Sequence, residues 1–166
     1  MTKETVDVLI IGAGPSGCVS ASYLANNKIN VKIVEKVKFP RYVIGESLLP
    51  RCMDHFDEVG LLDILKKQNY EIKRGARFLR GDEVCNFDFS KKFTNGWDWT
   101  WQVPRSHFDN ILAEETQKKG VTIDFENEVI AVEFDGSKSI TTVKDIHGNE
   151  KHIHANYIID ASGYGR

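Results

Sequence analysis

Three glycines near the amino terminus, Gly12, Gly14 and Gly17, have the spacing G-x-G-x-x-G and directly follow a short apolar run. In a strand–loop–helix unit, the first glycine permits a tight turn and the second lets the backbone approach a diphosphate. The third lets the helix pack closely on the strand, and the helix amides attract the anion. Glu35, at the end of the next apolar run, stands where a carboxylate accepts ribose hydroxyls. The pattern predicts an adenine-dinucleotide site.

The alternative is that the glycines only make a tight strand-to-helix turn and that Glu35 is a solvated strand end. We prefer the dinucleotide site, because strand, glycines, helix, second strand and acid follow one another in the order that such a site needs. The motif by itself does not separate FAD from NAD.

The elements that must position this loop are a buried strand over residues 6–11, a helix over residues 15–27 and a strand over residues 31–36. They form one βαβ unit and therefore a parallel strand pair. Residues 71–103 alternate and carry aromatics, which predicts an antiparallel patch. A helix is expected from Ser106, with Asp109 as in a capping box, to Gly120.

Residues 128–154 contain three alternating segments and two turn signals, which predict a β-meander. The segment "NYIID" is expected to form a further buried strand that runs into a loop of small residues. The expected fold class is therefore α/β.

Composition sets broad limits on partners. The chain has 166 residues, 41% hydrophobic and 28% charged, with a formal net charge of −2, which gives no reason to expect nucleic acid. Its apolar runs are too short for a signal peptide or a membrane span, so we expect a cytoplasmic protein. Cys18, Cys52 and Cys85 are widely spaced without a CxxC pair, so neither disulfides nor a metal site is expected.

Four landmarks, "GAGPSG", "FPRYVIGESLLP", "VPRSHFDNILAEE" and "DASGYGR", follow one another as in flavoprotein monooxygenases of the p-hydroxybenzoate hydroxylase type. Within that superfamily, "GESLLP" and "WTWQVP" resemble the flavin-dependent halogenases, whose second motif is W-x-W-x-I-P. Val103 replaces the isoleucine and keeps the β-branch. The resemblance covers essentially all of this chain, whereas the members of the family are several hundred residues long.

This resemblance implies a Rossmann-like FAD-binding fold with a parallel sheet, a β-meander and the start of an antiparallel substrate-facing layer. Residues 1–166 would form the FAD-binding domain, with 71–104 as the beginning of that layer. Ser47 is expected to open a helix, Arg105 to reach the flavin side and Asp160 to match the acid of a second cofactor motif. The residues implied to bind FAD are Gly12, Gly14, Pro15, Ser16, Gly17, Glu35, Arg41, Glu46, Ser47, Arg105 and Asp160.

The family pattern K-x-G-A-x-F appears at residues 73–78, which makes Lys73 the candidate catalytic lysine that handles hypochlorous acid. A covalent role requires a buried lysine with few partners, because only the neutral amine is nucleophilic. The alternative is a solvated lysine on the polar side of an alternating strand.

Trp97, Trp99 and Trp101 are spaced by two, so a strand would place all three on one face. The resemblance implies that Trp99 and Trp101, with Pro104, separate the flavin from the substrate and exclude water. Core packing is the preferred explanation for Trp97.

The implied function is that of an FAD-dependent oxidoreductase that uses reduced FAD and O2 to oxidise a halide ion and halogenate an electron-rich small molecule. The substrate would be free or tethered to a carrier, and a separate flavin reductase would supply reduced flavin. Three alternatives stay open: a flavin hydroxylase, a geranylgeranyl-reductase-like enzyme, and a truncated FAD-binding fragment without activity, since the chain ends before a further family cofactor motif.

Overall fold

The computed structural model describes residues 3–164, so residues 1–2 and 165–166 of the expected domain lie outside the described part of the chain. These residues form two compact units. The first contains the chain up to Tyr42 and again from Asp109, and the second contains Val43–Phe108. The second boundary falls inside helix α4 (Arg105–Lys118).

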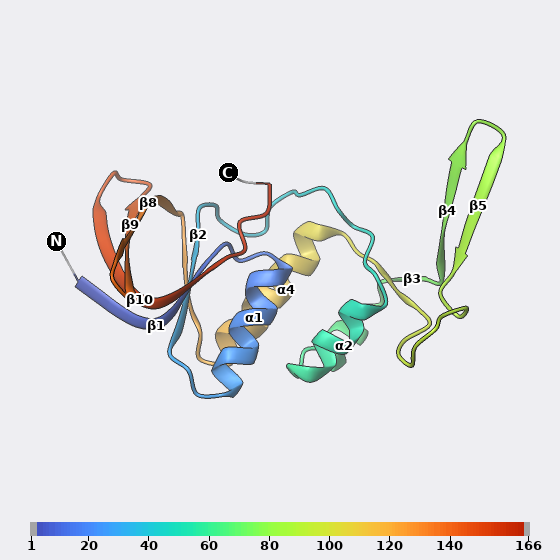
Figure 1. Cartoon of the computed structure of the whole chain (residues 1–166), viewed down its shortest axis with the longest axis horizontal. Coiled ribbons are helices and arrows are strands. Elements are labelled where there is room, and N and C mark those ends of the chain that lie inside the picture. The colour runs from blue at the N-terminus through green and yellow to red at the C-terminus, as the bar shows by residue number, and fades with distance from the viewer. Residues whose placement is uncertain (1–2, 165–166) are drawn as a thin grey trace. The chain divides into compact units, whose positions relative to one another are not determined.

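The first unit is built on a six-stranded sheet with the order β7-β2-β1-β10-β9-β8 (Figure 1). Strands β7, β2, β1 and β10 run parallel, whereas β9 is antiparallel to both β10 and β8. The bounds of the strands are β1 (Lys3–Ile11), β2 (Val31–Glu35), β7 (Thr122–Phe125), β8 (Asn127–Asp135), β9 (Lys138–Asp145) and β10 (Glu150–Asp160). The predicted βαβ unit and α/β fold class are confirmed.

A single strand, β10, covers the residues for which two strands were expected. The third meander segment and the buried strand "NYIID" are both parts of β10, whose first half pairs with β9 and whose length also pairs with β1. The prediction of a separate, buried last strand was therefore wrong, and none of residues 156–160 is buried. The backbone stays extended at Ala155 and Asn156, because β10 pairs with β1 on both sides of this point.

Two helices of the first unit lie side by side, α1 (Pro15–Asn26) and α4 (Figure 1). Small residues allow their close approach: the hydroxyls of Ser22 and Thr116 are 3.2 Å apart. Thr116 also donates to the carbonyl of Leu112, 2.8 Å away, within its own helix. A buried hydroxyl is thus satisfied where the two helices meet.

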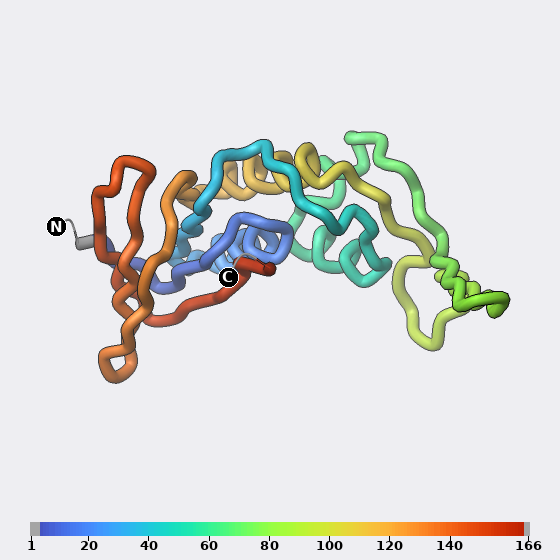
Figure 2. The backbone as a smooth tube through the Cα atoms, turned by 90° about the horizontal axis from the view of Figure 1, so that it is seen from above, coloured from blue at the N-terminus to red at the C-terminus, as the bar shows by residue number. Residues whose placement is uncertain are grey.

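The β-meander encloses a small core with the parallel strands. Strand β8 contacts β2 although the two are far apart in the strand order, so the sheet curls back on itself. The chain reverses from β7 into β8 at Glu126, whose φ is 59°. Figure 2 shows the β8–β9 turn projecting from this layer. The enclosed core contains Val6, Leu9, Val34, Val143, Ile153 and Ala155.

The second unit combines short helices with two antiparallel strand pairs. Helices α2 (Arg51–Glu58) and α3 (Leu62–Lys66) precede the pairs β3 (Glu71–Lys73) with β6 (Thr100–Gln102) and β4 (Gly75–Arg80) with β5 (Glu83–Asp88). The antiparallel pairing expected for this region is confirmed. That it faces a substrate stays a prediction.

Apolar burial in the second unit is concentrated away from the β4–β5 hairpin. Phe56, Tyr70 and Trp101 are buried, with edge-to-face contacts that include Tyr70 to Trp101 at 6.1 Å between ring centroids. Phe78 and Phe87 of the hairpin are each 59% exposed and contact one another. Among the residues described, no helix combines the length and the apolar character needed to cross a membrane.

Candidate functional site

The glycine loop connects β1 to α1, and two of its glycines are required by the fold itself. Gly12 has φ = 101°, and a Cβ there would lie 2.6 Å from the carbonyl oxygen of Ala161. A Cβ on Gly17 would lie 2.0 Å from the carbonyl oxygen of Gly12. Because real Cβ atoms do not approach that closely, any side chain at these two positions would displace the backbone.

Gly14 differs from the other two, because the packing of the protein does not require a glycine there. Its φ is −68°, which any residue adopts, and the nearest atom to an ideal Cβ is Nη2 of Arg41 at 3.6 Å. Pro15 and Ser16 then begin α1, which has no side-chain hydrogen bond at its N-cap. A Cβ would therefore fill a cradle formed by helix amides and a guanidinium. Such a cradle fits a diphosphate.

Arg41 is held firmly beside this cradle. Its Nη1 donates to Oδ2 of Asp109 at 3.1 Å, and its guanidinium carbon lies 4.6 Å from the ring centroid of Phe39. Asp109 is fully buried. The expected capping box is wrong, because α4 begins at Arg105, so that Ser106 lies inside the helix and Asp109 binds Arg41.

Glu35 is buried at the end of β2, only 5% exposed, and its carboxylate binds backbone. Oε2 accepts from the amide of Ala13 at 2.8 Å and Oε1 from the amide of Val37 at 3.1 Å. The alternative of a solvated strand end is therefore wrong. A carboxylate has about four lone-pair directions, so these two bonds leave room for ribose hydroxyls.

A pocket of about 90 Å³ joins the glycine loop to the meander. Gly12 and Glu35 line it together with residues that the sequence did not single out: Ile11, Val34, Lys36, Asn127, Glu128, Val129 and Ser162. Asn127, Glu128 and Val129 reach this position because the chain reverses at Glu126, a non-glycine residue with positive φ. The sequence carried no local signal for that reversal.

The end of β10 is fastened next to the glycine loop. Oδ1 of Asp160 accepts from the amide of Ser162 at 3.0 Å and from its hydroxyl at 2.6 Å. The amide of Ala161 donates to the carbonyl of Ile11 at 2.9 Å. The structure thus brings Asp160 to the same edge of the sheet as Gly12, where parallel strands end and ligands bind.

In the second unit, residues 46–48 are extended rather than helical. The amide of Val103 donates to the carbonyl of Glu46 at 2.8 Å, and that of Leu48 to the carbonyl of Trp101 at 3.2 Å. Ser47 forms an isolated bridge with Gln102, and α2 begins only after Pro50. The prediction that Ser47 opens a helix was wrong, because pairing with β6 replaced the local helical signal.

Lys73 lies in β3, half-buried, and it reaches across to this extended segment. Its Nζ donates to Oγ of Ser47 at 2.6 Å and to the carbonyl of Leu48 at 3.3 Å, and lies 5.2 Å from the centroid of the Phe89 ring. The burial and lack of partners that a covalent role requires are therefore not met, and the catalytic role of Lys73 stays a prediction. The contacts do unite two predicted site residues, Lys73 and Ser47.

Arg105 is the first residue of α4, and it binds the segment that leads to Glu46. Its Nη1 donates to the carbonyl of Gly45 at 3.1 Å. Gly45 has φ = 117°, and a Cβ there would lie 3.2 Å from the same nitrogen. Pro104, immediately before Arg105, is exposed. Arg105 therefore supports the backbone next to Glu46 and Ser47, the two other predicted cofactor-binding residues of this segment.

The three tryptophans form a row of edge-to-face rings, although only Trp101 lies in a strand. Centroids are 5.4 Å apart both for Trp97 with Trp99 and for Trp99 with Trp101. Trp101 is 3% exposed, whereas Trp97 is half-buried, with Nζ of Lys66 at 5.6 Å from its ring centroid. The expectation that Trp97 packs in the core is therefore wrong, whereas the partition role of Trp99 and Trp101 stays a prediction.

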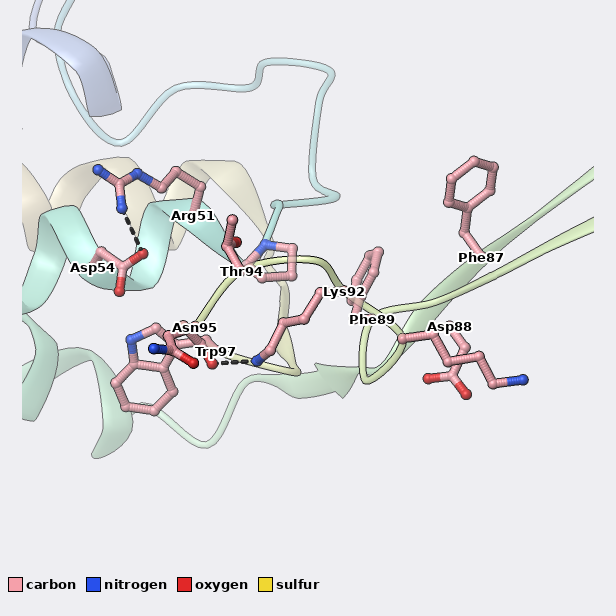
Figure 3. A pocket seen from close by; sticks show the side chains of 12 residues that line it. Arg51, Asp54, Phe87, Asp88, Phe89, Lys92, Thr94, Asn95 and Trp97 are labelled. Carbon is pink, nitrogen blue, oxygen red and sulfur yellow. Dashed lines mark hydrogen bonds and ion pairs between the residues drawn. The ribbon is translucent and has the colours of Figure 1, made fainter.

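A larger pocket, about 260 Å³, lies between α2, the end of β5 and the loop that carries Trp97 (Figure 3). Arg51 pairs with Asp54 at 3.1 Å, and Nζ of Lys92 donates to the carbonyl of Gly96. None of the predicted cofactor residues lines it. Gly12 and Glu35 line the smaller pocket instead. The described residues contain no group of three or more His, Cys, Asp and Glu side chains suited to a metal.

A parallel sheet with a glycine loop, an acid closing the second strand and an arginine beside the first helix defines an adenine-dinucleotide-binding domain. The chain belongs to the FAD binding domain family, whose profile matches residues 5–165, and the cofactor of that family is FAD. The resemblance to FAD-binding proteins drawn from the motifs is confirmed.

Similarity to individual proteins adds detail to the family match. The chain is 34% identical to the tryptophan 2-halogenase of Chondromyces crocatus over 96% of its own length and 30% of the relative's. It is 30% identical to a 1H-pyrrole-2-carbonyl-[peptidyl-carrier protein] chlorinase of Pseudomonas fluorescens, over 98% of its length and 40% of the relative's. The chain also resembles the crystal structure of a flavoprotein/dehydrogenase from Cytophaga hutchinsonii, with a TM-score of 0.91 and 57% sequence identity. That match covers 98% of this chain and 40% of the other. The chain thus spans less than half the length of each.

Proposed function

We propose that this chain binds FAD through its glycine loop and forms the cofactor-binding part of a flavin-dependent halogenase. The observation that carries the binding site is Gly14, a glycine that the fold does not need, next to Arg41 at the start of α1. Similarity to the tryptophan 2-halogenase over 96% of the chain supports the halogenase class.

Different residues of the first unit would bind different parts of the cofactor. The α1 amides and Arg41 would hold the diphosphate, since a guanidinium and helix N–H groups both favour phosphate oxygens. Glu35 would accept the ribose hydroxyls, and Asp160 would lie near the same end of the sheet. When bound, FAD supplies the redox chemistry with O2 and halide.

The residues of the second unit would hold the oxidised halogen and keep water away from it. Lys73 would hold hypohalous acid by hydrogen bonding, because Nζ already donates to the hydroxyl of Ser47 and keeps further donor capacity. Trp99 and Trp101, with Pro104, would exclude water from the reactive halogen. Glu46 and Arg105 would support the cofactor side of the extended segment at residues 45–48.

The proposed partners are a halide ion, a separate flavin reductase and an electron-rich small molecule. A substrate tethered to a carrier protein is included, because one relative is named as a chlorinase of a pyrrole carried by a peptidyl-carrier protein. We further propose a cytoplasmic location, where a reductase and reduced nicotinamide are at hand.

The test begins with FAD retained by the purified protein after free flavin is removed, followed by turnover with reduced FAD, O2 and bromide on indole, pyrrole and phenol substrates. Mass spectrometry should show a brominated product that depends on bromide and is lost in Lys73→Ala. Lys67→Ala, which removes an exposed lysine of the same unit, should keep activity. Oxygenated products without bromide dependence would contradict the halogenase assignment.

A flavin-dependent dehydrogenase or reductase is the second candidate. It is favoured by the 57% identity to a protein described as a flavoprotein/dehydrogenase. Rapid reduction of the bound flavin by NADPH alone, with a saturated or dehydrogenated product and no response to halide, would support this candidate over the first.

A further inference from the structure

We infer that Asp109 is a positioning residue for FAD: it holds the guanidinium of Arg41 in the orientation that meets the diphosphate at the start of α1. The inference rests on the proposed FAD binding. It assigns a role to a residue that the G-x-G-x-x-G motif does not include and that lies on another helix, far along the chain.

The two terminal nitrogens of Arg41 have different neighbours. Nη1 donates to Oδ2 of Asp109 at 3.1 Å, whereas Nη2 lies 3.6 Å from the position of an ideal Cβ on Gly14. A guanidinium is planar and has donors on more than one edge. It can therefore bind a carboxylate with one edge while another edge faces a phosphate.

The ring of Phe39 restricts the remaining conformational freedom of the Arg41 side chain. The guanidinium carbon of Arg41 lies 4.6 Å from its centroid, and Phe39 in turn contacts Phe125 at 5.2 Å between centroids. Phe125 closes β7, so the stack is anchored to the sheet. The arginine is held at one face by an aromatic ring and at one edge by a carboxylate.

Asp109 is suited to this task because it is buried and belongs to a helix. It lies in the second turn of α4 and is fully buried, while the side chain of Arg41 is 19% exposed. A buried carboxylate requires a charged or hydrogen-bonded partner, so the pair should persist when the site is empty. The cost of ordering a long arginine is then met on folding rather than on ligand binding.

Asp109 also places a negative charge near the anion site, which opposes FAD. Removal of that charge would raise the long-range attraction for a diphosphate, while release of Arg41 would weaken the local contact. The first effect is screened by salt, and the second is a contact between adjacent groups. We therefore expect the loss of orientation to dominate, and Asp109→Asn to weaken FAD binding by about tenfold, the scale of ordering one long side chain.

The experiment is a double-mutant cycle on the dissociation constant for FAD, measured by quenching of flavin fluorescence. The variants are Asp109→Asn, Arg41→Gln and the double variant, and Glu115→Gln, which alters an ion pair with Lys118 on the same helix, is the matched control. Asp109→Asn should weaken binding in the wild-type background and have little further effect in the Arg41→Gln background. Equal weakening in both backgrounds, or wild-type affinity in Asp109→Asn, would overturn the inference.

A second measurement remains decisive if Arg41→Gln does not fold. ADP and adenosine serve as probes that differ in the diphosphate, and thermal unfolding without ligand records the stability of each variant. Asp109→Asn should weaken ADP binding by about tenfold and leave adenosine binding unchanged. A purely structural role would weaken both probes together. A wild type that binds neither FAD nor ADP would refute the proposed function, whereas the failure of Asp109→Asn alone would refute only this inference.

Discussion

The carboxylate of Glu35 accepts a hydrogen bond from the backbone amide of Ala13, with 2.8 Å between Oε2 and the nitrogen. This contact joins the end of β2 to the residue between the first two glycines of the loop. The other oxygen of the same carboxylate accepts from the amide of Val37. Glu35 therefore orders the loop in addition to its proposed contact with ribose.

Glu35→Gln tests this dual role. A glutamine presents one acceptor and one NH2 donor, so one of the two amides, that of Ala13 or that of Val37, would face a donor in a buried site. We expect a loss of about 1–3 kcal/mol in the free energy of unfolding and weaker FAD binding. Urea unfolding and fluorescence titration measure the two effects, and Glu58→Gln, at an exposed position of α2, is the control. Unchanged unfolding would show that the two hydrogen bonds contribute little.

Gly14→Ala and Gly17→Ala should differ in their effects. Alanine fits at Gly14 without strain and should leave stability unchanged or raise it by up to about 1 kcal/mol, but it should weaken FAD binding. At Gly17 the new Cβ would meet the carbonyl of Gly12 and should destabilise the fold by several kcal/mol. Thermal unfolding with and without FAD separates the cases. Normal FAD binding by Gly14→Ala would refute the diphosphate cradle.

Local patterns in the sequence predicted the elements around the glycine loop. An apolar run, three glycines, a helical segment and an acid lie within the first 35 residues, and each signal is read from neighbours in the chain. The spacing of the tryptophans by two is also a local property, but the strand that it predicted contains only Trp101. These predictions needed no knowledge of tertiary contacts.

Contacts across long separations could not be predicted in this way. Asp109 lies 68 positions from Arg41, and its spacing after Ser106 suggested a cap instead. Ser47 stood before a helical pattern, yet the backbone of residues 46–48 pairs with β6 and stays extended. In each case a tertiary hydrogen bond outweighed a local preference of smaller energy.

A cluster of charged side chains beside the meander core should determine how the free energy of unfolding falls at acid pH. Lys32, whose side chain is 7% exposed, contacts Glu4 at 2.5 Å and Asp124 at 2.8 Å, and Lys151 also binds Asp124. Burial alone would raise the pKa of Asp124, but hydrogen bonds from Lys151 and Lys32 outweigh it and hold the pKa below the usual 3.8. The contribution of Asp124 is therefore complete above pH 3.8 and is lost as the pH falls through its folded-state pKa.

Asp124→Asn should lower stability near neutral pH by about 2 kcal/mol and flatten the loss of stability below pH 4 or so. Burial would lower the pKa of Lys32, but its hydrogen bonds to Asp124 and Glu4 raise it above 10.5, so its contribution disappears only in strong alkali. Urea midpoints between about pH 2 and pH 8 measure the profile. A parallel profile in the variant would show that Asp124 does not control this fall at acid pH.

The three cysteines should react at very different rates. Burial raises the pKa of the Cys18 thiol from 9.0 to about 12, although its hydrogen bond with Thr116 works in the opposite direction. Cys52 is half-buried and Cys85 is exposed. Since the thiolate is the nucleophile, limiting maleimide at neutral pH should label Cys85 first and Cys18 at least about a hundredfold more slowly. Peptide mass spectrometry identifies the labelled site, and urea should remove the difference. Rapid labelling of native Cys18 would mean that α1 opens readily.

Thr141 and Ser139 point toward the same core from alternate positions of β9, yet their hydroxyls differ. Oγ of Ser139 donates to the carbonyl of Ala155 at 3.1 Å, whereas Oγ1 of Thr141 is buried without a hydrogen-bond partner among the described residues. An unsatisfied buried hydroxyl is costly, and valine has the same shape. Thr141→Val should therefore raise the free energy of unfolding by about 1 kcal/mol, and Ser139→Ala should lower it by a similar amount. Urea unfolding of both variants gives the comparison. A loss of stability in Thr141→Val would mean that this hydroxyl has a partner, such as a buried water, in solution.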